Sequence, residues 1–216
     1  MFGLTPDRIV ERARESSGKP GVPTLGESLL FGSLGFFGTS LLVFSTVAFA
    51  ERWMYEHLGL GLAYAVWAAL FILAGGAVLS RLVIGPGALL RFYPLFTFAF
   101  FLYAVGWIAA YFTLRDKRGE WLGSLVGTLL IAVVFAWGFR AWRAWPRMVI
   151  ALFTSHSAGY FLGDLINSSL GGRAGMLLWG ASYGWMFGMG LGYALYAAQR
   201  EARYALTNLS DKRADA

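Results

Sequence analysis

The sequence predicts an all-α polytopic membrane protein, a bundle of six transmembrane helices behind a short N-terminal amphipathic helix. Apolar residues make up 57% of the chain and charged residues only 14%, whereas about a quarter of a soluble domain is charged. Mean hydropathy is +0.57. Six apolar runs reach the roughly 20 residues that a membrane-spanning helix needs. Many of the 28 glycines fall inside these runs, as expected for closely packed membrane helices.

The first expected element is a short helix over residues 5–15. Thr5 suits the N-cap and Pro6 the first helical position. Its mixture of charged and apolar residues favours a helix that lies at the lipid headgroups. Residues 16–23 read as a flexible link, so we expect residues 1–28 to form a cytoplasmic amphipathic segment and linker.

A six-helix transmembrane domain is expected over residues 29–198. Its predicted spans are 29–50, 58–80, 92–114, 121–140, 147–169 and 174–198. Gly85-Pro86-Gly87 marks a turn, Pro146 opens the fifth span, and Gly171-Gly172 separates the fifth from the sixth. Residues 199–216 are polar, and we expect them to be a frayed cytoplasmic tail.

The positions of lysine and arginine predict the orientation of the chain. Most of them fall in four segments that six spans would place on one side of the membrane, at 8–19, 81–91, 140–147 and 200–213. The positive-inside rule then puts both termini in the cytoplasm, with the plasma (inner) membrane as the expected location. Arg81, Arg91 and Arg140 are expected to extend toward the headgroups. The basic cluster at 115–118 is the exception.

Composition also excludes several kinds of site. The chain has no cysteine and two histidines, which excludes disulfides, thiolate metal centres and a multi-histidine centre within one chain. The net charge of +6 fits contact with anionic lipid better than nucleic-acid binding, because no soluble domain is present to bind nucleic acid. Expected partners are membrane lipid, further copies of the chain, or a larger membrane complex.

Small residues recur every four positions in the last two spans. The sixth span carries Gly180, Gly184, Gly188 and Gly192, and the fifth carries Gly159 and Gly163. Such ridges let two helix backbones approach closely. We expect them to pack the fifth and sixth spans into a tight antiparallel hairpin, although glycines can also leave room for a cofactor or a pore.

A row of polar side chains lies on the fifth span. It consists of Ser155, His156, Tyr160, Asp164 and Asn167. At 1.5 Å per residue, His156 lies near the bilayer midplane and Asp164 about 12 Å farther out, too far for direct contact. Ionisable groups in a membrane are costly and usually face the bundle interior or a water cavity. The row is therefore either a set of structurally satisfied groups or a functional site.

The leading functional hypothesis is a small channel or transporter for protons or small ions, with this row lining the path. A weak inverted similarity between residues 26–35 and 119–127 favours it. The alternative is a non-catalytic membrane subunit that packs against partners or binds a haem, pigment or lipid through its glycine and aromatic surfaces, with His156 as a possible axial ligand. A membrane enzyme acting on lipid is the third hypothesis, and the sequence shows no catalytic constellation for it.

Overall fold

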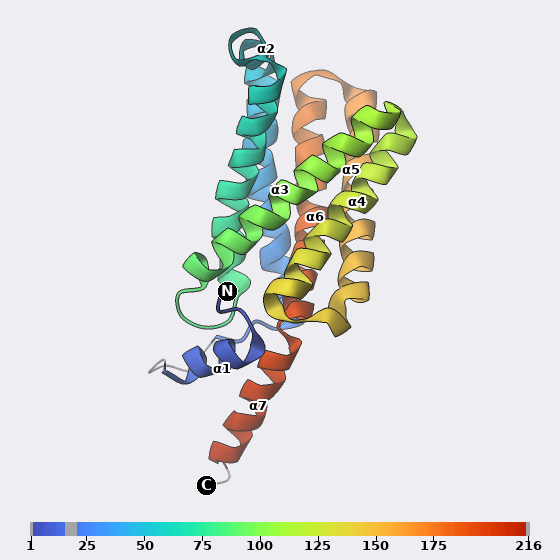
Figure 1. Ribbon diagram of the computed structural model, residues 1–216. Coiled ribbons are helices and arrows are strands. Elements are labelled where there is room, and N and C mark those ends of the chain that lie inside the picture. Colours follow the sequence, from blue (N-terminus) through green and yellow to red (C-terminus); the bar gives the residue numbers. More distant parts are fainter. Residues whose placement is uncertain (1, 16–20, 215–216) are drawn as a thin grey trace.

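The chain is helical apart from short turns throughout residues 2–15 and 21–214, the part that the computed structural model describes (Figure 1). The all-α prediction is therefore confirmed, while residues 16–20 of the expected linker lie outside the described residues. The helices are α1 (Pro6–Glu15), α2 (Leu25–Leu79), α3 (Ala88–Leu114), α4 (Lys117–Phe139), α5 (Trp145–Leu170), α6 (Gly172–Ala198) and α7 (Arg200–Ala214), with short 3-10 turns η1 (Ser80–Leu82) and η2 (Trp142–Ala144).

Helix α2 contains the first two predicted runs and reverses direction at Gly59 (Figure 1). Gly59 has φ 74° and ψ 170°, a conformation that strongly favours glycine. The residues before it stay helical, although a loop was expected between 50 and 58. An ion pair between Arg52 and Glu56, 2.7 Å long, links adjacent turns there.

Four helical stretches of the described chain are long and apolar enough to cross a membrane. They are Leu25–Leu82, Ala88–Leu114, Lys117–Phe139 and Trp142–Leu170. Helix α6 is not among them, because its many glycine, tryptophan and tyrosine residues contribute little hydropathy.

Figure 1 shows α1 and α7 at one end of the bundle, which we call the terminal end. The reversal within α2 and the connections from α3 to α4 and from α5 to α6 lie at the opposite end, which we call the far end.

Helix α6 packs between α2 and α5, and glycines make both contacts close. The ridge from Gly180 to Gly192 faces α2: a Cβ built at Gly184 would lie 2.5 Å from Ser40 Cβ, and one at Gly188 would meet the carbonyl oxygen of Gly32. The expectation that this ridge packs against the fifth span is therefore wrong. Helical rotation decides which neighbour a ridge meets, and spacing alone does not reveal it.

The α5 glycines do pack against α6. A Cβ at Gly159 would lie 3.0 Å from the Ser182 carbonyl oxygen, and one at Gly163 would lie 2.7 Å from Ser182 Oγ. Helices α5 and α6 thus form the expected antiparallel hairpin, but through the α5 ridge and a different face of α6. In addition, Ser40 Oγ of α2 donates a hydrogen bond of 2.7 Å to the Gly180 carbonyl.

Two buried polar side chains hold the terminal end together. Arg91 donates to the carbonyl oxygens of Gly3, Ile84 and Gly85 at 3.0, 3.0 and 3.1 Å, and it is only 7% exposed. The expectation that Arg91 extends toward headgroups is therefore wrong. The carbonyl groups of the turn after η1 accept the hydrogen bonds of the buried Arg91 guanidinium, which water would otherwise accept.

Gln199 makes the second set of contacts at the terminal end. It joins η1 to the end of α6, since its amide accepts from Ile84 N at 2.8 Å and donates to Leu82 O and Leu195 O at 3.0 Å each. The chain then continues as α7 rather than as the expected frayed tail, with Ala202 buried. Helix α1 contacts α7 and buries Ile9 and Ala13.

Candidate functional site

His156 of α5 lies in the interior, where side chains from α3 and α6 reach it. Its side chain is fully buried, and its Nε2 is 2.7 Å from the hydroxyl of Tyr103 on α3. The same hydroxyl is 2.9 Å from the hydroxyl of Tyr183 on α6. A continuous hydrogen-bonded chain therefore links one side chain from each of three helices.

Aromatic rings enclose the imidazole. The Phe187 ring lies 4.8 Å from it, the Tyr183 ring 5.3 Å and the Tyr103 ring 5.5 Å, all edge to face. One turn along α5, the Tyr160 ring is nearly parallel to the imidazole at 6.0 Å. The helical spacing of four residues brings His156 and Tyr160 to the same face, so the structure keeps this pair of the predicted row together.

Several buried polar atoms around this site have no protein partner. They include His156 Nδ1 and Ser157 Oγ. The indole Nε1 atoms of Trp107 and Trp179 also lack a partner, and both of these rings lie beside Tyr160, at 5.7 and 5.4 Å. Unpaired buried donors and acceptors are uncommon in proteins and often mark ordered water or a functional group. The unpaired groups extend from His156 past Tyr160 toward the far end.

Asp164 forms a separate charged group at the far end. Its carboxylate lies 2.7 Å from Lys117 Nζ, and Lys117 also pairs with Glu120 at 3.0 Å. Asp164 therefore does not contact His156, in line with the spacing argument. Lys117 belongs to the basic cluster at 115–118, which is the exception to the positive-inside pattern. Its positive charge is paired with the carboxylates of Asp164 and Glu120.

The side chains of Ser155 and Asn167 contact residues other than those of the His156 cluster. Ser155 donates to the Leu152 carbonyl at 3.2 Å and packs against Gly190 of α6. Asn167 lies at the α5–α6 turn, where a Cβ at Gly175 would come within 2.8 Å of its Oδ1. The structure thus divides the predicted row into a buried centre, a charged far end and two helix-packing residues.

Tyr103 and Tyr183 complete the site, although the sequence alone does not single them out. Each lies in a run rich in aromatic residues, and which tyrosine faces the interior depends on helix rotation and pairing. The available signal was the hydroxyl itself, because a tyrosine deep within a membrane helix needs a hydrogen-bond partner.

The arrangement suits proton exchange better than cofactor ligation. Histidine and tyrosine can each donate and accept a proton, and no carboxylate bonds to His156 within the described chain. The residues do not fit a haem or pigment at His156, because Nε2 is engaged by Tyr103 and aromatic rings surround the imidazole. Nor do the described residues include a cluster of three potential metal ligands.

The surroundings of His156 are therefore polar at a few defined atoms and aromatic elsewhere. Burial and hydrogen bonding fix the orientation of the ring, while Nδ1 has no hydrogen-bond partner in the protein.

A comparison with protein families, curated proteins and solved structures finds no match to this chain.

Proposed function

We propose that this protein is a small integral membrane transporter for protons, with His156 as its central site. In this proposal the two arms of α2 and helices α3 to α6 make six spans, and both termini face the cytoplasm across the plasma (inner) membrane. The reversal at Gly59 and the shared location of α1 and α7 at one end support this topology. The concentration of arginine near that end supports the orientation.

The observation that carries the proposal is a fully buried imidazole that uses one nitrogen and leaves the other unpaired. Ionisable groups inside membrane bundles are costly and commonly mark ion or proton paths. The unpaired indole groups beside Tyr160 then continue the polar route toward Lys117, Asp164 and Glu120. Water molecules at these groups would connect His156 to the far end.

The packing favours a transporter over an open channel. Toward the terminal end, His156 is followed by fully buried apolar side chains on both α5 and α6: Met148, Leu152, Leu191 and Leu195. This apolar layer closes the route on one side of the site. A fully buried site with an apolar layer on one side and polar groups on the other is compatible with alternating access, in which helices move to expose the site to each side in turn.

Protonation supplies a reason for such movement. A protonated His156 would be a buried cation whose hydrogen-bonded partners here are the neutral hydroxyls of Tyr103 and, through it, Tyr183. The other neighbouring titratable side chain, Tyr160 of α5, is also neutral at ordinary pH. An unpaired buried charge destabilises its surroundings strongly, so uptake of a proton would favour a more open arrangement of α3, α5 and α6.

Proton flux into liposomes tests the proposal. Purified protein is reconstituted with a pH-sensitive dye inside the vesicles, and an outside-acid gradient is applied. We expect wild-type protein to acidify the lumen faster than empty vesicles, His156→Gln to abolish the difference, and Asp164→Asn to reduce it. His57→Gln is the matched control, since His57 lies exposed on α2 near the far end, outside the site.

The outcome depends on comparing the four proteins with one another and with empty vesicles. Flux in wild-type vesicles that equals flux in empty vesicles, under either sign of membrane potential, contradicts the proposal. Equal flux in wild-type and His156→Gln vesicles removes the assigned role of His156. A loss of flux in His57→Gln as large as that in His156→Gln would show that the readout reports folding rather than the site.

A further inference from the structure

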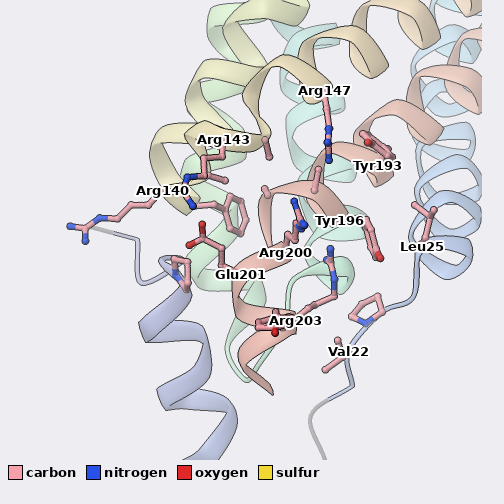
Figure 2. A pocket seen from close by; sticks show the side chains of 18 of the residues that line it. Val22, Leu25, Arg140, Arg143, Arg147, Tyr193, Tyr196, Arg200, Glu201 and Arg203 are labelled. Carbon is pink, nitrogen blue, oxygen red and sulfur yellow. The ribbon is translucent and has the colours of Figure 1, made fainter. Parts of the chain in front are cut away.

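A cavity of about 900 Å³ opens at the terminal end of the bundle, separate from the His156 cluster (Figure 2). Its walls come from the chain entering α2, from the segment joining α4 to α5, and from the junction of α6 with α7. These elements are far apart in the sequence. The cavity is therefore a product of the tertiary fold, and its size is within the usual range of about 300–1,000 Å³ for small-molecule sites.

Arginine dominates the charge of this cavity. Five arginines line it: Arg140, Arg143, Arg147, Arg200 and Arg203. Glu201 is the one acidic side chain among the described residues of its wall. Figure 2 shows Arg147, Arg200 and Arg203 extending into the cavity, while the end of the Arg140 side chain points away from it. The cavity therefore has a strong excess of positive charge.

Arg203 is held in place by an aromatic ring. Its guanidinium carbon lies 3.4 Å from the centre of the Tyr196 ring, a stacking geometry that fixes the planar group. Burial lowers the pKa of Arg203, the neighbouring Tyr196 raises it, and the positive charge of Arg200 lowers it. An anion placed between Arg200 and Arg203 would offset both the burial and the repulsion between the two cations.

We infer that this cavity binds the phosphate group of a larger anionic ligand. Guanidinium groups match phosphate oxygens through paired hydrogen bonds, and several arginines converge here. Tyr193, Tyr196 and Tyr204 add hydroxyl groups and flat apolar surface to the wall. The cavity is much larger than a phosphate ion, so the remaining volume accommodates the group that carries it.

The phosphate can be that of a lipid headgroup or of a soluble compound. Lipid phosphates lie at the level of a bilayer where basic and tyrosine side chains gather, and this cavity lies at the basic end of the apolar bundle. A soluble phosphate compound would enter the same cavity from the aqueous side. The inference does not depend on the transport proposal, because none of the His156 cluster lines the cavity.

Two binding experiments, one in nanodiscs and one in detergent, separate these sources. In one arm, protein in discs of neutral phosphatidylcholine is titrated with inorganic pyrophosphate by calorimetry. In the other, detergent-solubilised protein is titrated with short-chain phosphatidylglycerol and, as a neutral reference, short-chain phosphatidylcholine. The variants are Arg147→Gln, Arg200→Gln and Arg203→Gln. Arg81→Gln is the matched control, since Arg81 is exposed in η1 and does not line the cavity.

We expect saturable binding in at least one arm, weakened about tenfold or more by each cavity variant because hydrogen bonds to charged groups are strong. Arg81→Gln should bind as wild type does. Binding only of phosphatidylglycerol identifies a lipid ligand, and binding of pyrophosphate identifies a soluble one. Absence of saturable binding in both arms, or equal weakening by Arg81→Gln, overturns the inference. Circular dichroism of each variant verifies that it remains folded.

Discussion

Replacing Gly188 with leucine is expected to separate α6 from α2 and to cost more than about 3 kcal/mol of stability. Even a Cβ at this position would meet the Gly32 carbonyl and lie 2.8 Å from Phe36 Cβ. Backbone cannot move aside as a flexible side chain does, so the cost should exceed the roughly 1–3 kcal/mol typical of overpacked cores. Membrane helices associate mainly through close packing, so loss of contact has no hydrophobic compensation.

Unfolding by SDS in mixed micelles, followed by tryptophan fluorescence, measures this effect. Gly38→Leu is the matched control, because Gly38 is an exposed glycine of α2 with no atom near the position of a new Cβ. We expect the control to unfold close to wild type and Gly188→Leu to unfold at much lower SDS or fail to fold. Equal stability of the two variants would contradict the placement of α6 against α2.

Replacing Gln199 with leucine is expected to destabilise the terminal end by about 2–4 kcal/mol, since each buried polar group left unpaired costs about 1–3 kcal/mol. Leucine fills similar space but cannot accept from Ile84 N or donate to Leu82 O. Both backbone groups belong to the tight connection between α2 and α3. The helix ends at η1 and at the α6–α7 junction should therefore loosen together.

Amide hydrogen exchange localises this change. We expect faster exchange at residues 80–86 and at the start of α7 in Gln199→Leu, with the far end unaffected. Asn208→Leu, an exposed substitution on α7, serves as the control and should leave exchange at 80–86 unchanged. Uniformly faster exchange along the chain would instead indicate a global loss of stability and would contradict a local role for Gln199.

Most of the long helices could be predicted from the sequence, because each contains a long apolar run. The turn at Gly85-Pro86-Gly87 and the break at Gly171-Gly172 were also predictable, since these residues disfavour a continuing helix. The prediction of a loop between residues 50 and 58 was wrong. Residues 51–58 contain no proline or glycine, and an ion pair supports their helix, so α2 continues to Gly59.

The candidate site was predictable only in part, because its members come from different helices. His156 stood out as a titratable residue in an apolar run. Tyr103 and Tyr183 could not be selected without knowing that the rotation of α3 and α6 directs these two side chains at His156. The surroundings of Arg91 were also not predictable from the sequence. A cation near a helix end suggested contact with lipid headgroups, whereas the fold surrounds this side chain with backbone carbonyls.

The protonation state of His156 provides the most direct test of its assigned role. Because the chain has two histidines, His57→Asn leaves His156 as the single imidazole, whose nitrogen resonances can be followed by solid-state NMR in liposomes. We predict a neutral ring with a hydrogen bond at Nε2 at neutral pH, which becomes imidazolium on acidification together with loss of that bond to Tyr103. A ring that stays neutral at every pH at which the protein remains folded would contradict a proton-carrying His156.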